Sequence, residues 1–303
     1  MNEPALSFER VTRTFGRKTA VDGLSLRVEP GTVLGMVGRN GAGKTTSLRL
    51  ALGTLFADAG RIRVLGLDPE IDAMEVRTRV SLLSEESHLY SWMTVREMLD
   101  FGAALHPRWD PELAKSLIGR LDLDPRQVVE TLSRGTKAKV ALVLGVACRP
   151  DLLLLDDPTA GLDPLVRREV LQGVLDGVSD EGGAVVYASH LIHDVERVAD
   201  RVAILDEGRL RLEDSLEALK AEVRRVTAVF EGDAPTPVDI PGQLDAVRDG
   251  RVLSLVARGD AAQLEAQARS LGAREVEIEP LSLEEILVAC LRQRAEPQEV
   301  EHV

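Results

Sequence analysis

Cysteine is scarce in this sequence: Cys148 and Cys290 are its only two cysteines, and they lie far apart. Their spacing matches no metal-binding pattern, and one pair cannot provide the disulfide framework of a small secreted domain. The N-terminal segment, MNEPALSFER, carries an acidic side chain early and no apolar stretch, so no signal peptide is expected. Together these absences favour a reducing compartment, the cytoplasm, as the place where the protein works.

Long hydrophobic runs and an excess of positive charge are both absent. The longest apolar run, around residues 138–148, is about half as long as a helix that crosses a bilayer. The protein is therefore expected to be soluble, and any role at a membrane would need a partner. With 37 Lys and Arg residues against 50 Asp and Glu residues, the formal net charge is −13, which argues against nucleic acid as a partner.

Aromatic residues make up 3% of the chain and hydrophobic residues of all kinds 44%, so aliphatic side chains must form the core. The 303 residues allow one large domain or two of ordinary size. Segments typical of strands are expected at 4–9, 24–28, 32–38, 61–66 and 80–85, and again at LLLLDD, GAVVYASH and RVAILDEG. Helical patterns lie between them and dominate residues 94–149, and such alternation predicts an α/β fold with a parallel sheet.

The pattern changes after about residue 214. The helix-like SLEALKAEVRR leads to the strand-like VTAVFEG and a turn-rich segment, followed by a strand at 252–259, a helix at 261–272, a strand at 274–280 and a helix at 281–293. This order predicts a small α+β accessory domain over residues 215–303, after a first domain over residues 1–214.

Residues 38–45, GRNGAGKT, fit the phosphate-binding pattern G-x-x-x-x-G-K-[ST]. The segment lies between a predicted strand and a predicted helix, which is the context that this loop requires. Its glycines let backbone N–H groups curl around phosphates, and the helix N-terminus adds a positive dipole end. Lys44 would reach the β- and γ-phosphates and the Thr45 hydroxyl would bind Mg²⁺, whereas the alternative is a glycine-rich turn with a chance lysine.

Four leucines run directly into Asp156 and Asp157 in the segment LLLLDDPTAGLD, residues 152–163. An unbroken apolar run is typical of a fully buried strand. Acidic side chains at the carboxyl end of such a strand usually face a ligand. The two adjacent carboxylates are therefore candidates for metal binding and for catalysis.

Other motifs stand in a particular order around these two. TRTFGRKTAVDGLSL precedes the phosphate loop, SEESHLYSWMTVRE and TLSRGTKAK follow it, and ASH comes after LLLLDDPTAGLD. Together they resemble the ATP-binding cassette (ABC) ATPases, most closely the nucleotide-binding subunits of membrane transporters. The resemblance covers about residues 4–214. It implies a P-loop NTPase core with a helical subdomain around residues 86–150, and ATP and Mg²⁺ as cofactors.

The resemblance implies ATP contacts on two surfaces of the cassette. Phe15 matches the aromatic residue that stacks on adenine, although a core phenylalanine at a strand edge is the alternative. Ser133 and Gly135 match the signature loop, which binds the γ-phosphate held by another copy, while two other positions of TLSRGTK depart from the common LSGGQ. Asp163 matches an aspartate of the loop that crosses between copies. The residues implied to bind ATP are Phe15, Gly38, Arg39, Asn40, Gly41, Ala42, Gly43, Lys44, Thr45, Thr46, Ser133, Gly135 and Asp163.

The resemblance also implies a catalytic set. Asp156 matches the aspartate that holds Mg²⁺ together with Thr45. Asp157 stands where the family has a catalytic glutamate that activates water. His190 of ASH matches the histidine that contacts the γ-phosphate, and Lys44 completes the set with its positive charge.

Two positions depart from the pattern of the family. Glu85 falls where a glutamine usually touches Mg²⁺ and the attacking water; Glu86 is the rival placement, and a solvated acidic pair is the alternative. Glutamate is a suitable oxygen ligand, so Glu85 joins the predicted metal set and the predicted catalytic set. Asp157 is one methylene shorter than the usual glutamate, which bears on the rate of hydrolysis.

The sequence therefore predicts the subunit that energises a membrane transporter. In this hypothesis ATP binding joins two copies, so that Lys44 of one copy and Ser133 of the other share a nucleotide, and hydrolysis releases them. The end segment EVEIEPLSLEEILVACL loosely resembles exporter subunits whose membrane domains are separate chains. We expect a homodimer at the inner face of the cell membrane, held there by a separate transmembrane permease.

Two alternatives stay open at this point. A soluble ABC ATPase of translation, DNA repair or chromosome structure would carry two cassettes or a long coiled coil, whereas this chain has one phosphate loop and a short stretch between Lys44 and Asp156. A regulatory ATP-binding switch with slow turnover, not coupled to transport, is kept open by Asp157 and Glu85.

Overall fold

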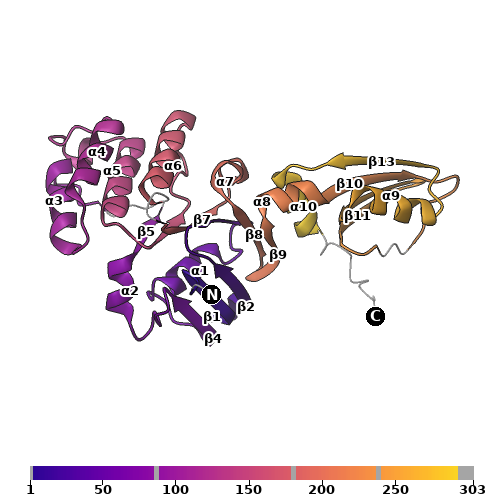
Figure 1. Cartoon of the computed structure of the whole chain (residues 1–303), viewed down its shortest axis with the longest axis horizontal. Helices are drawn as coiled ribbons and strands as arrows, with labels where there is room; N and C mark the ends of the chain where they lie inside the picture. The colour runs from indigo at the N-terminus through magenta and orange to yellow at the C-terminus, as the bar shows by residue number, and fades with distance from the viewer. Residues whose placement is uncertain (1–2, 85–88, 179–181, 237–239, 293–303) are drawn as a thin grey trace. The chain divides into compact units, whose positions relative to one another are not determined.

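The computed structural model describes residues 3–84, 89–178, 182–236 and 240–292. The chain divides into two compact units, Met1–Leu210 and Arg211–Val303. The expected division after residue 214 falls inside β9, a strand that runs from Arg209 to Ser215. The first unit contains a parallel sheet and a group of helices within residues 89–150, called the helical insert, and the second contains a smaller antiparallel sheet (Figure 1).

A six-stranded sheet has the order β5-β6-β7-β3-β8-β9. Its strands are β3 (Val33–Val37), β5 (Val80–Ser84), β6 (Leu152–Asp156), β7 (Ala184–Ser189), β8 (Arg201–Asp206) and β9 (Arg209–Ser215). The first five of these pair in parallel, which confirms the expected α/β fold. β3 and β7 are buried along their whole length and β6 along its leucines, because a parallel sheet is covered on both faces.

A second sheet of the first unit is antiparallel, with the order β2-β1-β4. β1 spans Leu6–Phe15, β2 spans Lys18–Val28 and β4 spans Ala59–Val64. β1 and β2 extend beyond the expected strands at 4–9 and 24–28. The expected strands were too short because register shifts between Phe8 and Thr14 interrupt the alternation of apolar and polar side chains. Side chains of both sheets, among them Phe8, Leu26, Leu34 and Leu154, belong to one hydrophobic core.

The helices of the first unit are α1 (Lys44–Ala51), α2 (Ala73–Arg79), α3 (Val95–Leu105), α4 (Pro111–Arg120), α5 (Arg134–Ala147), α6 (Pro164–Val178) and α7 (Ile192–Val198). The expected helical stretch 94–149 consists of α3, α4 and α5, with a single 3₁₀ turn at Val129–Thr131. Thr94, Asp110 and Ser133 cap these three helices by accepting a hydrogen bond from a backbone N–H of the first turn. In the described ranges, no helix is both long enough and apolar enough to cross a bilayer.

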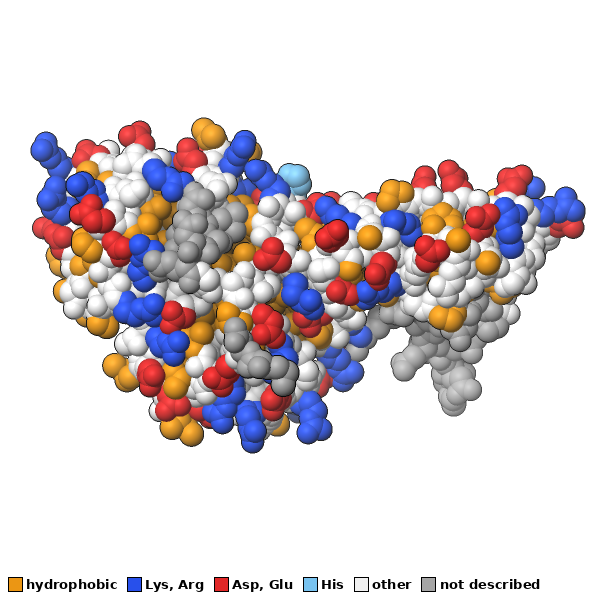
Figure 2. Space-filling view, viewed as in Figure 1, with side chains coloured by type: hydrophobic (Ala, Val, Ile, Leu, Met, Phe, Trp, Pro, Cys, Tyr) orange, Lys and Arg blue, Asp and Glu red, His pale blue; other side chains and the backbone are white. Residues whose placement is uncertain are grey.

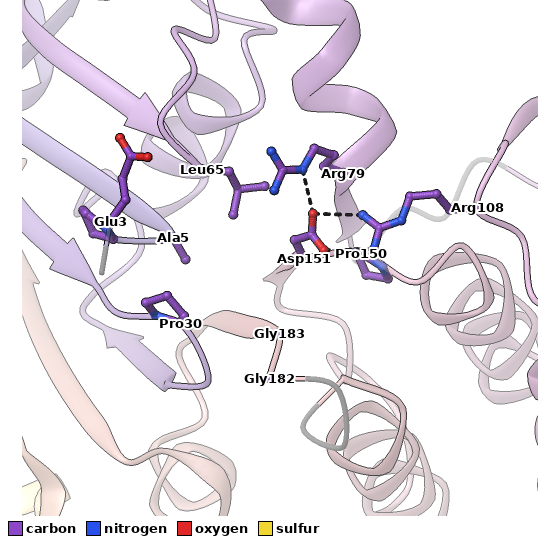
Figure 3. Close-up of a pocket in the computed structure, with 11 residues that line it drawn as sticks. Glu3, Ala5, Pro30, Leu65, Arg79, Arg108, Pro150, Asp151, Gly182 and Gly183 are labelled. Carbon is purple, nitrogen blue, oxygen red and sulfur yellow. Dashed lines mark hydrogen bonds and ion pairs between the residues drawn. The ribbon is translucent and has the colours of Figure 1, made fainter. Parts of the chain in front are cut away.

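An ion-pair cluster at the start of β6 ties the helical insert to the parallel sheet. Asp151 accepts a hydrogen bond from Nε of Arg79 at 2.6 Å and from both terminal nitrogens of Arg108 at 2.9 Å (Figure 3). Arg79 ends α2 and Arg108 follows α3, so one carboxylate joins the two parts. Burial alone would raise the pKa of Asp151, but the two guanidinium groups outweigh it and hold that pKa below its ordinary value.

The second unit is built on a four-stranded antiparallel sheet with the order β11-β12-β10-β13. Its elements are α8 (Leu216–Glu222), β10 (Val223–Val229), β11 (Gln243–Asp249), β12 (Val252–Arg258), α9 (Ala261–Ser270), β13 (Glu275–Pro280) and α10 (Leu283–Arg292). The expected helix over 215–225 is wrong at its end, because residues 223–225 already pair with β12 in β10. The sequence does not predict β11, whose residues are mostly exposed and show no apolar alternation.

Candidate nucleotide-binding site

The loop between β3 and α1 turns sharply at its glycines. Gly43 has a φ of 100°, and a Cβ there would lie 2.4 Å from the carbonyl oxygen of Ala20, so only glycine fits. The loop curves around the side chain of Lys44, whose Nζ donates hydrogen bonds to the carbonyl oxygens of Gly38 at 2.7 Å and Arg39 at 3.3 Å. The ammonium group is therefore held inside the loop by the loop's own backbone.

Lys44 is 6% exposed, which is unusual for a lysine. Burial lowers the pKa of Lys44 below its ordinary value, while the carboxylates of Asp157 and Asp156 act in the opposite direction. A partly desolvated ammonium under a loop of backbone N–H groups is suited to bind phosphate oxygens.

A cleft of about 460 Å³ opens over this loop. It is lined by Phe15, Lys18, Ala20, Asn40, Gly41, Ala42, Gly43, Lys44, Thr45, Thr46 and Asp157. Phe15 is 44% exposed at the end of β1, so it is not a core residue, and the guanidinium carbon of Arg13 lies 4.9 Å from the centre of its ring. Stacking of this ring on a base stays a prediction. Lys18 also lines the cleft but was not predicted to do so; its position in TRTFGRKTA, shortly before the loop, is the available signal.

Thr45 and Asp156 meet at the carboxyl end of β6, where the Thr45 hydroxyl donates to Oδ1 of Asp156 at 2.9 Å. Burial raises the pKa of Asp156 above its ordinary value, and the nearby positive charges of Arg49 and Lys44 do not offset this effect. An added cation would therefore be favourable here. A hydroxyl and a carboxylate are oxygen ligands that suit Mg²⁺, which commonly completes its shell with water and phosphate.

A complete metal-binding cluster of protein side chains would need at least a third ligand beside Thr45 and Asp156. Across the described residues, no group of three or more His, Cys, Asp and Glu side chains is arranged to hold a metal ion by itself. Thr45 and Asp156 are two oxygen ligands that would suit Mg²⁺, with water and phosphate as its usual further ligands.

Asp157 follows β6 with a left-handed backbone, at a φ of 47°. Its Oδ1 atom accepts hydrogen bonds from the Ser189 hydroxyl at 2.9 Å and from the backbone N–H of His190 at 3.1 Å, and lies 2.9 Å from Nδ1 of the His190 ring. The parallel pairing of β6 with β7, which sets Asp156 opposite Ala188, brings these distant residues together. Asp157 and His190 therefore form a carboxylate–imidazole pair, of which Asp157 also lines the cleft.

The structure does not bring every predicted ligand residue to this cleft. Ser133 caps α5, where its hydroxyl oxygen accepts a backbone N–H of the first turn at 3.1 Å, and Gly135 lies in the same turn. Asp163 caps α6 by accepting two backbone N–H groups, each at 3.1 Å. Among the described residues that line the cleft, Ser133, Gly135 and Asp163 do not occur. Ser133 and Asp163 are exposed to solvent.

Glu85 and its rival Glu86 lie outside the described residues. The last described position before them is Ser84, at the carboxyl end of β5 and opposite Asp156 of β6. The role of Glu85 as a metal and water ligand stays a prediction.

Residues 21–160 match the protein family described as ABC transporter. The daunorubicin resistance ATP-binding protein DrrA3 of Streptomyces coeruleorubidus is 37% identical over 227 residues, which cover 73% of this chain and 72% of that protein. The Nod factor export ATP-binding protein I of Paraburkholderia xenovorans is 36% identical over 251 residues, which cover 80% of this chain and 81% of that protein. The structure of cbiO1 from Clostridium perfringens, part of the ABC transporter complex cbiONQ, matches with a TM-score of 0.61 and 26% identity over 71% of this chain and 89% of that chain.

Proposed function

This chain belongs to the ATP-binding cassette ATPases of the ABC transporter family, and from that premise we propose that it hydrolyses ATP to drive export through a separate membrane permease. The observation that carries the proposal lies at the carboxyl end of β6. Asp156 is hydrogen-bonded to Thr45 of the phosphate loop, and the next residue, Asp157, is paired with His190. One strand end thus offers a carboxylate for a cation and a carboxylate for water, which supports hydrolysis.

The triphosphate would lie over the loop between β3 and α1. Nζ of Lys44 would exchange the carbonyl oxygens of Gly38 and Arg39 for β- and γ-phosphate oxygens. The Phe15 ring, which also lines the cleft, would stack on adenine. Thr45 and Asp156, with Glu85 as a further proposed ligand, would hold Mg²⁺, which neutralises negative charge as the phosphoryl group is transferred.

Asp157 would orient the attacking water and accept its proton. Its Oδ1 is engaged by Ser189 and His190, so Oδ2 is the atom proposed to face the water. An ionised carboxylate can only accept, so Nδ1 of His190 must carry the proton of the bond between them. Nε2 of His190 is then left to contact the γ-phosphate.

A complete site would need a second copy of the chain. Ser133 and Asp163 are exposed and lie outside the cleft lining, so they are available to the cleft of another copy. At the N-terminus of α5, the Ser133 hydroxyl and the backbone N–H of Gly135 would meet the γ-phosphate held by the partner. Because ATP contacts both copies only in the closed pair, its binding shifts the population toward the dimer and hydrolysis reverses the shift.

The helical insert is the proposed docking surface for the permease. Trp92 is 70% exposed there, and the Tyr90 ring lies 6.0 Å from Trp92 and 5.4 Å from Phe101 between ring centres. Large exposed aromatic side chains are enriched where proteins meet. Docking on this aromatic group would hold the chain at the inner face of the membrane. Export is supported by two relatives that are described as a resistance protein and an export protein.

Nucleic acid is not a proposed partner. On the face shown in Figure 2, the described acidic and basic side chains are interspersed rather than gathered into one basic surface. The formal net charge of −13 acts in the same direction, since a phosphate backbone attracts basic surfaces.

A regulatory ATP-binding switch with slow turnover is the second candidate function. Asp157 follows the buried leucines of β6, and its side chain is one methylene shorter than that of a glutamate. Because of this shorter arm the carboxylate reaches less far toward a water molecule, which would slow hydrolysis while ATP binding is kept.

Lys44→Ala tests the proposed function. It removes the charge that stabilises the transferring phosphoryl group, so phosphate release from Mg–ATP should fall by at least about 100-fold. Lys115→Ala, at an exposed lysine of α4, is the matched control and should hydrolyse ATP like the parent. Near-normal hydrolysis in Lys44→Ala would contradict the assignment of the site. Copurification of a polytopic partner from the native membrane, followed by ATP-driven export in proteoliposomes, would test the coupling to transport.

A further inference from the structure

Ser189 is the last residue of β7, and none of its surface is exposed to solvent, 0% by area. Its hydroxyl oxygen lies 2.9 Å from Oδ1 of Asp157 and 3.0 Å from the backbone nitrogen of Leu191. The N–H of Leu191 can only donate, so the hydroxyl accepts there and its single hydrogen is left for the carboxylate. Ser189 is therefore held by the backbone while it donates to Asp157.

The hydrogen bonds of the Asp157 carboxylate gather on one oxygen. In the part of the chain that the structure describes, all of them end on Oδ1. The side chain of His190 is 46% exposed, so its bond to Oδ1 competes with water, whereas the bond from Ser189 is shielded. Of the two side chains that contact Oδ1 of Asp157, Ser189 therefore forms the hydrogen bond that is better protected from water.

A buried tyrosine supports Ser189 from the same face of β7. Burial raises the pKa of Tyr187 to about 12, against hydrogen bonds with Thr159 and Ser189 that act in the other direction. The phenol therefore keeps its proton at neutral pH and adds no negative charge beside Asp157. Its hydroxyl lies 3.2 Å from the hydroxyl of Thr159. Both hydroxyl groups also contact Oδ2 of the buried Asp194, at 3.2 Å from Thr159 and 3.5 Å from Tyr187, so Ser189 borders a buried polar cluster as well as the Asp157 carboxylate.

We propose that Ser189 is a positioning residue, which fixes Oδ1 of Asp157 and thereby aims Oδ2 at the attacking water. The inference rests on the proposed hydrolysis and adds to it the group that orients the short acidic side chain. The cleft is lined by Asp157, so the oxygen that Ser189 does not hold is the one left for a ligand there. Orientation of this kind has a large effect, because a displacement near 1 Å costs on the order of 100-fold in rate.

Ser189→Ala removes the donor and leaves the volume nearly unchanged. We expect kcat for ATP hydrolysis to fall about tenfold, because a shielded hydrogen bond to a carboxylate is lost, while KM for Mg–ATP stays within about twofold. Ser7→Ala is the matched control, since Ser7 is a buried serine of β1 in the other sheet, and it should change neither value. In an Asp157→Asn background, Ser189→Ala should alter the residual rate by less than about twofold, because the two residues act through one group.

An undiminished kcat in Ser189→Ala would overturn the inference, and so would equal tenfold losses in the parent and in the Asp157→Asn background. A raised KM with an unchanged kcat would also overturn it, because that result marks a defect in binding. Lys44→Ala, measured in the same series, separates the two claims. If Lys44→Ala hydrolyses ATP like the parent, the proposed function fails; if Lys44→Ala and Asp157→Asn lose activity while Ser189→Ala keeps it, only the role of Ser189 is removed.

Discussion

Asp157→Asn removes one negative charge from the end of β6 and hardly changes the shape of the side chain. The amide oxygen can still accept from the Ser189 hydroxyl and from the backbone N–H of His190, so the fold should be kept. The variant loses the ability to take a proton from water, and a general base contributes about 10²- to 10⁴-fold to a rate. Three polar contacts to Oδ1 already stabilise the negative charge and make the carboxylate a weaker base. We therefore expect a rate loss at the lower end of this range, about 100-fold.

Nucleotide binding should survive this substitution. Asp157 is one of the two carboxylates that act on Lys44, and removing its charge leaves the ammonium group freer to attract a triphosphate. The variant should therefore bind ATP at least as well as the parent and accumulate as the ATP-closed dimer. Phosphate release measures the rate, a fluorescent ATP analogue measures the affinity, and light scattering with and without ATP measures the mass of the assembly.

Asp157→Glu is the companion variant. One added methylene moves the carboxylate outward by about 1.5 Å, the length of a C–C bond, and the open cleft that Asp157 lines leaves room for it. Hydrolysis should be as fast as in the parent or faster. If Asp157→Asn releases phosphate like the parent, the reasoning is refuted and the base lies elsewhere, with Glu85 or His190 as the next candidates. A parent without turnover, even with its membrane partner present, would favour the regulatory switch.

Two further predictions concern the fold. Asp151→Asn should lower the free energy of unfolding by about 1 kcal/mol at neutral pH, since Arg79 and Arg108 are partly exposed. The pKa of Asp151 is lower in the fold than in the unfolded chain, so its stabilisation is present above the unfolded value of about 3.9 and is lost as the pH falls through the folded value. Urea midpoints of parent and variant should therefore converge in acid, and an equal gap at every pH would contradict the pairing. Truncation after residue 220 should leave a folded core that binds a fluorescent ATP analogue, because the motifs precede that position; loss of binding would show that the boundary is misplaced.

Features that depend on neighbours in the chain could be predicted from the sequence. The phosphate loop is one of these, since the backbone N–H groups, Lys44 and Thr45 are consecutive, and the glycines that shape the loop lie among them. The parallel sheet is another, because the unbroken apolar run before Asp156 is typical of a strand covered on both faces, and such runs alternate with helical patterns. Strand limits were less predictable where packing decides them, as in β1, whose register shifts hide the alternation.

The surroundings of Asp157 were decided by tertiary structure. A single sequence indicated that Asp157 and His190 share a site only through the resemblance to a family, and it gave Ser189 no role. The parallel register of β6 on β7, with Leu155 opposite Tyr187 and Asp156 opposite Ala188, is what delivers a serine hydroxyl and an imidazole to the same carboxylate oxygen. A slip of one residue would turn these side chains to the other face of the sheet. Local spacing therefore determined which residues can bind phosphate, whereas the pairing of strands distant in sequence decided which groups hold the carboxylate of Asp157.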